Sequence, residues 1–328
     1  MKLLIVNQDE VEQLLPMSEC ITVMTDALLA LANGHVHLPL RMVVRPPEAK
    51  GVMALMPAYV SGENTAFGVK LIGVFNGNPV LGKDSHQGAV LLLSCETGEP
   101  LALMNASAIT AIRTAAVSGV ATRLLARVEC GDVAIIGSGV QARSHLAAMA
   151  CVRSIRRVRV VSRNFAHAQQ FVSDLQAAYS FPIEAVNTVE AAVRDADLIV
   201  TATSSSEPVL KRDWISYGAH LNVVGASQSF AREVDSATMA AASLFVDRRE
   251  STLNESGDYL FALRDGAIGP DHIRAEIGEV LIGAKPGRIN QDEITLFKSL
   301  GLAIEDLAAA EYVYRQAHVM GLGTWVEF

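Results

Sequence analysis

The sequence has no surplus of positive charge and few charged residues of either sign. Lysine and arginine together number 27 against 35 acidic residues, which gives a formal net charge of −8 at pH 7. A nucleic-acid-binding protein is expected to carry a basic surface. The charge balance therefore argues against a nucleic-acid partner.

Cysteine is scarce, and its spacing matches neither a disulfide framework nor a metal site. The 4 cysteines are scattered along the chain, at Cys20, Cys95, Cys130 and Cys151. Zinc ligands have short, regular spacings, and dispersed cysteines are typical of reduced thiols in a cytosolic protein. We therefore expect no structural metal ion and a cytoplasmic location.

Long hydrophobic runs are also missing, although apolar residues make up 50% of the 328-residue chain. No uninterrupted apolar run reaches the roughly 18 residues that a membrane-spanning helix needs. The apolar N-terminal stretch at 1–6 is followed at once by Asn7, Gln8, Asp9 and Glu10, unlike a secretory signal. We expect no membrane association, and the length favours two domains.

The most informative local motif is a glycine-rich turn that follows a short apolar run at 133–136. It has the spacing G-x-G-x-x-A. The first glycine allows a tight turn, the second lets the backbone approach a pyrophosphate, and the small third residue lets the helix pack on the strand. The N-terminus of that helix attracts anions. The motif predicts a dinucleotide site made by Gly137, Gly139, Val140, Gln141 and Ala142.

The pattern of apolar residues changes near residue 131. The first third favours α+β structure, with strands at 41–45, 51–56, 67–75, 89–94 and 100–104 and a helix at 107–126. Strands then alternate with helices, which predicts a doubly wound parallel sheet. The strands are expected at 132–136, 157–161, 183–186, 197–201, 219–223 and 243–246, and the early helices at 140–152, 164–178 and 188–194.

One more amphipathic helix is expected at about 300–320. Because it lies far from the nucleotide motif, we expect it to return to the first domain. The fold class is thus α/β, with a Rossmann-type doubly wound parallel sheet plus an α+β domain. The dinucleotide-binding domain is predicted at 121–300, and the α+β domain is discontinuous, at 1–120 with 301–328.

The end of the second predicted parallel strand bears on the choice of cofactor. NAD-binding folds place an acidic residue there, which binds the ribose 2′-hydroxyl and repels a 2′-phosphate. This chain has Ser162, Arg163 and Asn164 instead, and an arginine pairs well with phosphate. The residues favour NADPH over NADH. Thr201 and Thr203, in the polar loop after a later strand, are also predicted to line the cofactor. A plain surface arginine and a flexible turn are the structural alternatives.

Several motifs together resemble the ornithine cyclodeaminase/mu-crystallin family, nearly end to end and closest to its ketimine reductase branch. The matching segments are Lys70-Leu71-Ile72, Ser85-His86-Gln87, residues 111–118, residues 137–142, Val224-Gly225-Ala226-Ser227 and residues 297–301. The resemblance implies a homodimer whose α+β domain serves dimerisation and substrate binding. It also implies a nicotinamide cofactor and an amino acid or imino acid substrate.

The resemblance assigns Arg41, Lys70 and Arg113 to the substrate carboxylate. Lys70 lies in an otherwise apolar strand and Arg113 in an alanine-rich helix, which are unusual places for a cation. The structural alternatives are a snorkelling lysine, a surface arginine and a helix ion pair. Toward the cofactor, the resemblance points to five residues: Arg113, Thr114, Val224, Lys298 and Ser299.

Two departures from the cyclodeaminase pattern concern the reaction. Ser227 stands where those enzymes carry an aspartate, and Ala54 precedes Leu-Met-Pro where they carry a glutamate. Serine is a poor general base without a partner, so cyclisation of ornithine with loss of ammonia is disfavoured. Reduction of a cyclic 2-imino acid to an L-amino acid asks mainly for orientation. The proton donor is left open among Lys70 and a water held by Ser227 or His86.

The expected activity is therefore NAD(P)H-dependent ketimine reduction, with Δ1-pyrroline-2-carboxylate or Δ1-piperideine-2-carboxylate as substrate and a place in proline metabolism. The same residues leave other readings open. One is an ornithine or lysine cyclodeaminase, and another is an amino acid dehydrogenase. A third is a non-catalytic, NADPH-dependent ligand-binding protein.

Overall fold

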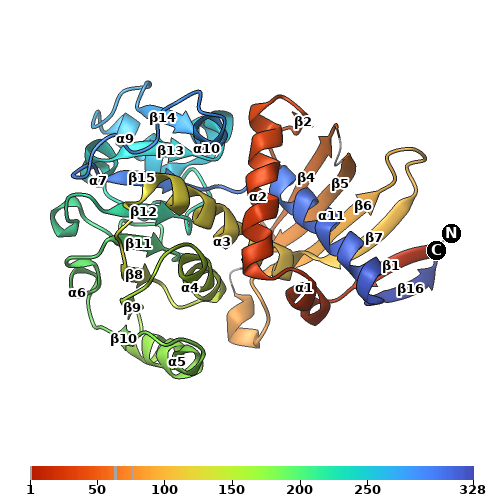
Figure 1. Ribbon diagram of the computed structural model, residues 1–328, viewed down its shortest axis with the longest axis horizontal. Coiled ribbons are helices and arrows are strands. Elements are labelled where there is room, and N and C mark those ends of the chain that lie inside the picture. Colours follow the sequence, from red (N-terminus) through yellow and green to blue (C-terminus); the bar gives the residue numbers. More distant parts are fainter. Residues whose placement is uncertain (1, 63–64, 76) are drawn as a thin grey trace. The chain divides into compact units, whose positions relative to one another are not determined.

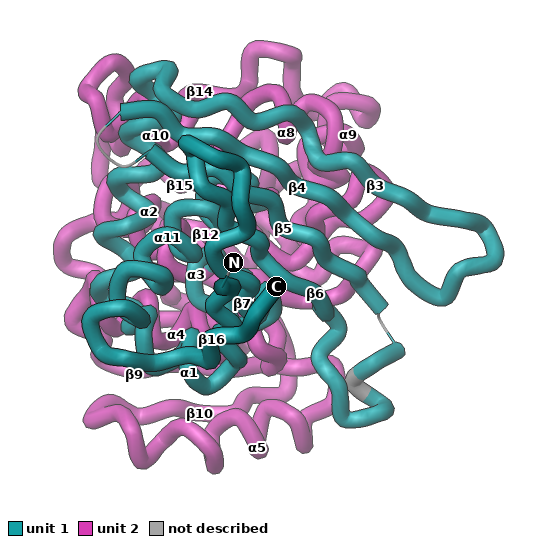
Figure 2. The backbone as a smooth tube through the Cα atoms, turned by 90° about the vertical axis from the view of Figure 1, so that its right-hand side faces the viewer, with its two compact units in different colours: residues 1–114, 301–328 teal, residues 115–300 magenta. Residues whose placement is uncertain are grey.

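The computed structural model describes residues 2–62, 65–75 and 77–328. The chain divides into two compact units, coloured separately in Figure 2. Unit 1 comprises Met1–Thr114 and Gly301–Phe328, and unit 2 comprises Ala115–Leu300. The first division falls inside helix α3 (Ala106–Leu125), whereas the sequence pattern places that boundary at residue 120.

Unit 1 is built on an eight-stranded mixed sheet, here called sheet A. Its strand order is β16-β1-β7-β6-β5-β4-β2, and β3 also pairs with β4. Strand β1 runs parallel to β7, and the neighbours from β7 to β4 are antiparallel. The elements are β1 Lys2–Val6, α1 Gln8–Leu14, α2 Met17–Ala32, β2 Val36–His37, β3 Met42–Val44, β4 Val52–Val60, β5 Ala66–Val74, β6 His86–Leu93, β7 Pro100–Asn105, α3, α11 Ala303–Met320 and β16 Thr324–Glu327.

One face of sheet A is covered by helices. Helix α11 packs on β4, β5 and β6, and α2 packs on α11 (Figure 1). Successive side chains of a strand point to opposite faces, so β5 buries Ala66, Lys70 and Ile72 and exposes Phe67 and Leu71. Lys70 therefore points to the helix-covered face, among apolar side chains.

Unit 2 contains a second eight-stranded sheet, sheet B, with the order β10-β9-β8-β11-β12-β15-β13-β14 and parallel pairing throughout the described strands. This confirms the predicted doubly wound architecture. The elements are β8 Asp132–Ile136, α4 Val140–Val152, β9 Arg157–Val161, α5 Phe165–Leu175, β10 Ile183–Ala185, α6 Val189–Val193, β11 Leu198–Thr201, β12 His220–Val223, α7 Ser236–Ala241, β13 Ser243–Val246, α8 Arg249–Glu255, α9 Gly257–Arg264, β14 Ile273–Glu276, α10 Ile277–Leu281 and β15 Thr295–Lys298.

The central strands of sheet B are buried on both faces, as parallel strands between helices should be. Strands β11, β12 and β15 are buried along their whole length. Such strands read as continuous apolar runs when their residues are apolar, as residues 133–136 of β8 do. Strand β15 contains Thr295 and Lys298, so its sequence does not stand out, and the sequence pattern misses it.

Helix α3 is long and apolar enough to cross a membrane by length and composition. Within the protein, 67% of its apolar 18-residue window is buried, as in a core helix. The cysteines predicted to be reduced are all free thiols in the structure.

Candidate functional site

In unit 1, the three cations assigned to the substrate carboxylate lie in one cluster, which we call the cation cluster (Arg41, Lys70 and Arg113). Lys70 comes from β5, Arg113 from α3, and Arg41 from the residue just before β3. The exposed fractions of Lys70 and Arg113 are only 3% and 4%. Sheet A and α3 thus bring together residues that are up to 72 positions apart in sequence.

Two carboxylates from the first turn of α11 balance this cluster. Oδ2 of Asp306 lies 2.6 Å from Nζ of Lys70, and its Oδ1 accepts a hydrogen bond of 2.9 Å from Nε of Arg113. Glu305 forms a further ion pair with Nη1 of Arg113. Buried ions need partners of this kind because desolvating an unpaired charge costs several kcal/mol. The ion-pair alternative considered for Arg113 is therefore present in the structure.

Neither carboxylate is predicted from the sequence. Acidic residues in a first helical turn are favoured by the helix dipole, so Glu305 and Asp306 look like ordinary features of a helix start. One signal was available, since both residues lie four or five positions after Gly301 in a motif already noted for its resemblance. Their burial, at 0% and 1% exposed, is visible only in the structure.

Gly301 is the residue against which two of the cations pack. Nη2 of Arg41 donates a 3.0 Å hydrogen bond to the carbonyl oxygen of Gly301. Gly301 has φ +79°, and a Cβ at this position would lie 2.4 Å from Nη1 of Arg113. Only glycine combines that backbone conformation with space for the guanidinium.

The cluster alters the ionisation of its members. Burial lowers the pKa of Lys70 to about 8, against the opposing effect of Asp306. Burial disfavours the charged form of Arg113, yet Asp306 and Glu305 together raise its pKa. Partial desolvation and the two nearby cations lower the pKa of His86, whose Nδ1 lies 3.0 Å from Oγ of Ser85. A neutral imidazole near the cluster is suited to accept a proton or to orient a water.

In unit 2, the predicted dinucleotide turn joins β8 to α4. Gly137 has φ +117°, and a Cβ there would lie 2.3 Å from the carbonyl oxygen of Ala202 on the neighbouring strand connection. Gly139 is the N-cap of α4. A Cβ on Gly139 would meet no described atom within 4 Å, so the space above the helix N-terminus is open. Ala142 is fully buried against the sheet.

This turn fits a pyrophosphate. The first amides of a helix have no acceptor within the helix, and glycine at the N-cap offers no side chain to satisfy them. Val140 and Gln141 contribute the next two amides, and the side chain of Val140 is 52% exposed. The backbone thus presents donors to an open space at the carboxyl edge of sheet B.

Three residues after β9 are predicted to bind the adenosine part of the cofactor, and their surroundings differ. Ser162 accepts a 3.0 Å hydrogen bond from Ser138 of the glycine-rich turn. Asn164 is the N-cap of α5, where its Oδ1 accepts from the amide of Ala166. Arg163 is exposed, and no ion pair engages it within the described part of the chain. Arg163 is thus the charge that remains available to a ligand.

The predicted loop residues Thr201 and Thr203 are organised by a carboxylate that sequence analysis missed. Glu233 is fully buried and accepts hydrogen bonds from Oγ1 of Thr201 at 2.8 Å and from both the amide and Oγ1 of Thr203 at 2.7 Å. It also accepts from the amide of Gly225 at 2.7 Å. Glu233 therefore ties the loop after β11 to the loop after β12, the segment that contains Val224.

Lys298 has an internal role at the end of β15. Its ammonium is fully buried, pairs with Asp258 at 2.9 Å and donates a 2.5 Å hydrogen bond to the carbonyl oxygen of Ala226. Asp258 in turn accepts from the amides of Glu233 and Val234. From this position the ammonium supports the loops and does not point to solvent. Ser299 is also buried, at 2% exposed.

The remaining predicted residues are placed as follows. Thr114 follows Arg113 on α3 and is 9% exposed. Ser227 is half-buried and comes directly after Ala226, the residue that Lys298 holds. Ala54 lies in β4 with 7% of its surface exposed, so it supplies a methyl group where a cyclodeaminase carries a carboxylate.

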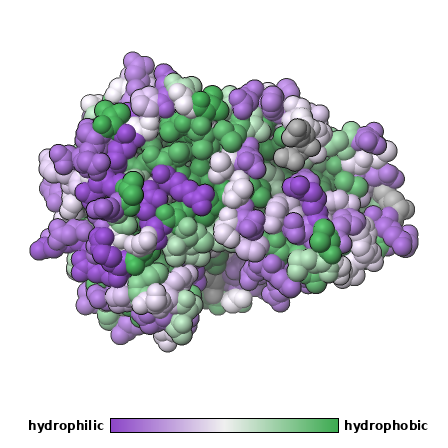
Figure 3. All heavy atoms as spheres, viewed as in Figure 1, coloured by the Kyte–Doolittle hydropathy of each residue, from purple (hydrophilic) through white to green (hydrophobic). Residues whose placement is uncertain are grey.

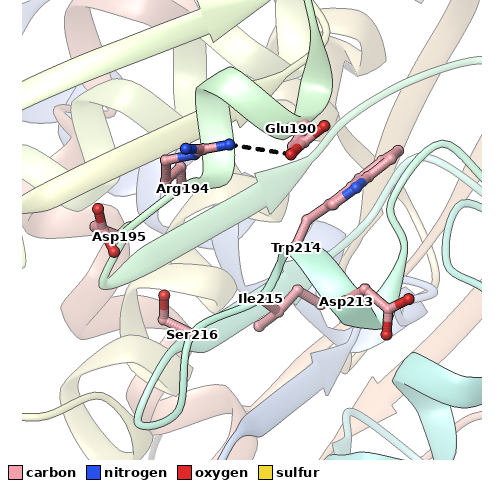
Figure 4. Close-up of a pocket in the computed structure, with 7 residues that line it drawn as sticks. All are labelled: Glu190, Arg194, Asp195, Asp213, Trp214, Ile215 and Ser216. Atoms are coloured by element: carbon pink, nitrogen blue, oxygen red, sulfur yellow. Dashed lines mark hydrogen bonds and ion pairs between the residues drawn. The ribbon is translucent and has the colours of Figure 1, made fainter.

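A surface hollow of about 440 Å³ lies elsewhere in unit 2. Figure 4 shows that Glu190 and Arg194, which are 3.1 Å apart, face the segment that contains Trp214 and Ser216. These residues precede β11 and β12, and they therefore lie at the amino ends of the parallel strands. Ligands of such sheets bind at the carboxyl ends, so we do not assign this hollow to the reaction.

Comparisons with known proteins identify the family of this chain. The model of the ornithine cyclodeaminase/mu-crystallin family matches residues 1–320. Ketimine reductase mu-crystallin of Mus musculus is 41% identical over 291 residues, which are 87% of this chain and 88% of the mouse protein.

Two solved structures are similar over almost their whole length. One is Δ1-pyrroline-2-carboxylate reductase of Thermococcus litoralis in complex with NADH and L-proline, with TM-score 0.96, 40% identity and coverage of 98% of this chain and 99% of that one. The other is an archaeal alanine dehydrogenase dimer with bound NAD, with TM-score 0.93, 34% identity and full coverage of both chains, each 100%. The protein described here belongs to the ornithine cyclodeaminase/mu-crystallin family.

Proposed function

We propose that this protein is an NAD(P)H-dependent ketimine reductase that converts small cyclic 2-imino acids, such as Δ1-pyrroline-2-carboxylate or Δ1-piperideine-2-carboxylate, to L-amino acids. The observation that carries the proposal is the cation cluster, in which the buried Lys70 and Arg113 lie with the half-buried Arg41. The relatives of this chain include ketimine and pyrroline-2-carboxylate reductases. The reaction has its place in proline metabolism, in the cytoplasm.

Reduction of a ketimine adds a hydride to the imine carbon and a proton to the nitrogen. The nicotinamide cofactor supplies the hydride when bound, and the glycine-rich turn at Gly137 and Gly139 is the part of the chain that fits its pyrophosphate. Unit 1 contributes the cations that bind the substrate carboxylate, since guanidinium and ammonium groups form the strongest hydrogen bonds to such anions. A carboxylate held in one place fixes the orientation of a small ring.

The proton is supplied within the same set of residues. Lys70, with a pKa of about 8, is mostly protonated at pH 7 and is a competent acid. His86 and Ser227 are the alternatives, each through a water. Positions 54 and 227 carry no carboxylate, which disfavours the deamination of ornithine.

NADPH is the preferred cofactor in this proposal, because Arg163 is exposed at the end of β9 where NAD-binding folds carry an acidic residue. Substitution of Arg163 by alanine should weaken the binding of NADPH on the order of tenfold to a hundredfold, since a charged hydrogen bond contributes roughly 1.5–3 kcal/mol. The binding of NADH should change little. Arg194, which pairs with Glu190 at the amino ends of the strands, provides the control substitution. Equal loss of both cofactors would reject the phosphate preference.

The protein acts as a homodimer in this proposal. On the helix-covered side of unit 1, hydrophilic side chains are interspersed among hydrophobic ones (Figure 3). The opposite face of sheet A exposes Met53, Phe67 and Leu71, by 40%, 41% and 44%. An apolar sheet face of this kind is typical of an interface between subunits. The similar alanine dehydrogenase structure is a dimer.

Light scattering tests the dimer. Leu71→Arg should yield monomers, because a charge on the apolar face must be desolvated at the interface. Val319→Arg, at a position 81% exposed on α11, is the matched control and should leave the mass unchanged. A dimer that persists in Leu71→Arg would place the interface elsewhere.

One experiment separates the candidate activities. The purified protein is mixed with NADPH and each cyclic ketimine, and loss of absorbance of the reduced nicotinamide is followed. Ornithine with NAD is assayed in parallel for ammonia. Fast oxidation in the first assay and no ammonia in the second support the reductase. Ammonia release would indicate a cyclodeaminase, and tight NADPH binding without turnover would indicate a ligand-binding protein.

A further inference from the structure

Asp306 occupies a special position among the charged residues of unit 1. Its carboxylate is 1% exposed and bridges two buried cations, with one oxygen 2.6 Å from Nζ of Lys70 and the other 2.9 Å from Nε of Arg113. The three side chains come from α11, β5 and α3. A single carboxylate that bonds both cations sets their separation, because charge-assisted hydrogen bonds are short and directional.

Asp306 differs in this respect from its neighbour Glu305. Glu305 pairs with Arg113, whereas Asp306 pairs with both Arg113 and Lys70. The charged groups that act on the Lys70 ammonium are Asp306, Arg113 and Arg41. Two of the three are cations, and they disfavour a third positive charge. Burial, and after it the positive charge of Lys70, lowers the pKa of His86.

We propose that Asp306 is a positioning residue of the substrate site, an inference that rests on the proposed reductase function. Asp306 holds the Lys70 ammonium beside the Arg113 guanidinium and keeps Lys70 charged, so that both can bind the carboxylate of an imino acid.

The electrostatics give this role a measurable consequence. Burial and the neighbouring cations lower the pKa of Lys70 to about 8, and Asp306 is the group that opposes them. Once Lys70 loses its proton, it no longer forms an ion pair with a carboxylate. Binding of the anion should therefore weaken as the pH rises through about 8. Without the charge of Asp306, the same loss should begin at lower pH.

The test compares the pH dependence of binding and of turnover in Asp306→Asn. Asparagine keeps the size and an acceptor oxygen but removes the charge. Pyrrole-2-carboxylate, a planar carboxylate that cannot be reduced as a ketimine, is titrated calorimetrically into the NADPH-loaded protein, and kcat/KM for the ketimine is measured over the same range. In Asp306→Asn, the pH at which probe binding and kcat/KM fall on the alkaline side should be lower by about one pH unit or more. Near the midpoint of the unmodified protein, this shift corresponds to about tenfold weaker binding of the probe.

Three further variants keep the test decisive. Glu305→Gln removes an adjacent buried charge that pairs with Arg113. In this variant, probe binding should weaken at the same alkaline pH as in the unmodified protein. Asp306→Glu should restore most of the original profile. Lys70→Arg should bind the probe with no alkaline loss near pH 8, because arginine stays charged.

The outcomes separate this inference from the proposed function. If the ketimines are not reduced but probe binding follows the predicted pH shifts, the reductase proposal fails and the role of Asp306 in anion binding stands. An unchanged profile in Asp306→Asn, an equal shift in Glu305→Gln, or a lack of probe binding by the unmodified protein would each overturn the inference.

Discussion

Acid stability offers a quantitative check on how unit 2 holds its nucleotide turn. His145 lies on α4, is fully buried and forms two hydrogen bonds: its Nδ1 is 2.7 Å from the carbonyl oxygen of Gln141 and its Nε2 is 2.9 Å from Oγ of Ser118. The carbonyl can only accept, so Nδ1 carries a proton. Burial disfavours the charged imidazole, and in the neutral ring Nε2 accepts from the serine hydroxyl.

The cost of this arrangement follows from the pKa. Burial lowers the pKa of His145 from 6.5 to about 4, a difference of about 2.5 units. Between these values the unfolded chain binds more protons than the native protein, so stability falls as the pH drops below about 6.5, and the loss levels off below about 4. At one pKa unit per 1.36 kcal/mol, the loss is about 2 kcal/mol at pH 5 and about 3 kcal/mol in full.

Urea unfolding at pH 7 and pH 5, followed by circular dichroism at fixed protein concentration, measures this loss. In His145→Gln, the decrease in the free energy of unfolding from pH 7 to pH 5 should be about 2 kcal/mol smaller than in the unmodified protein. Any packing defect of the variant affects both pH values and cancels. His220, whose pKa burial lowers to about 3, contributes in the same direction in both proteins and also cancels.

His167 is exposed on α5, and its replacement by glutamine should leave the difference between pH 7 and pH 5 unchanged. Equal losses in His145→Gln and the unmodified protein would refute the reasoning. They would mean that His145 takes up its proton in the native state as easily as in the unfolded chain.

Two further predictions concern the cofactor half of the chain. Gly137→Ala should abolish dinucleotide binding in a fluorescence titration, because φ +117° and a contact of 2.3 Å between the new Cβ and a carbonyl oxygen force the turn to move. Gly139→Ala, where the space is open, should fold with an unchanged melting temperature and bind the dinucleotide more weakly. Glu233→Gln should raise the KM for NADPH several-fold while the KM for the ketimine stays within about twofold, since an amide cannot accept all the hydrogen bonds that the carboxylate accepts. An equal rise in both KM values would contradict the assigned role of Glu233.

The elements that could be predicted are those whose sequence pattern spans only a few neighbouring residues. The β8–α4 turn, the alternation from β8 to β13 and the long helices α3 and α11 follow from glycine spacing and apolar periodicity, which act within a few residues. Strands β14 and β15 were not predicted. Charged or polar residues interrupt both, and β15 enters the sheet between β12 and β13 only through long-range pairing.

The candidate site shows the same division. By itself, the sequence determined that a dinucleotide turn exists, that an acidic ribose-binding residue is missing, and that cations stand in apolar surroundings, because each is a property of neighbouring residues. Only the tertiary structure decided what those cations meet. Asp306 reaches Arg113 across 193 positions, and Glu233 joins two loops that follow different strands. Such partners are selected by the energetic need to pair buried charges, a need that arises only once the chain has folded.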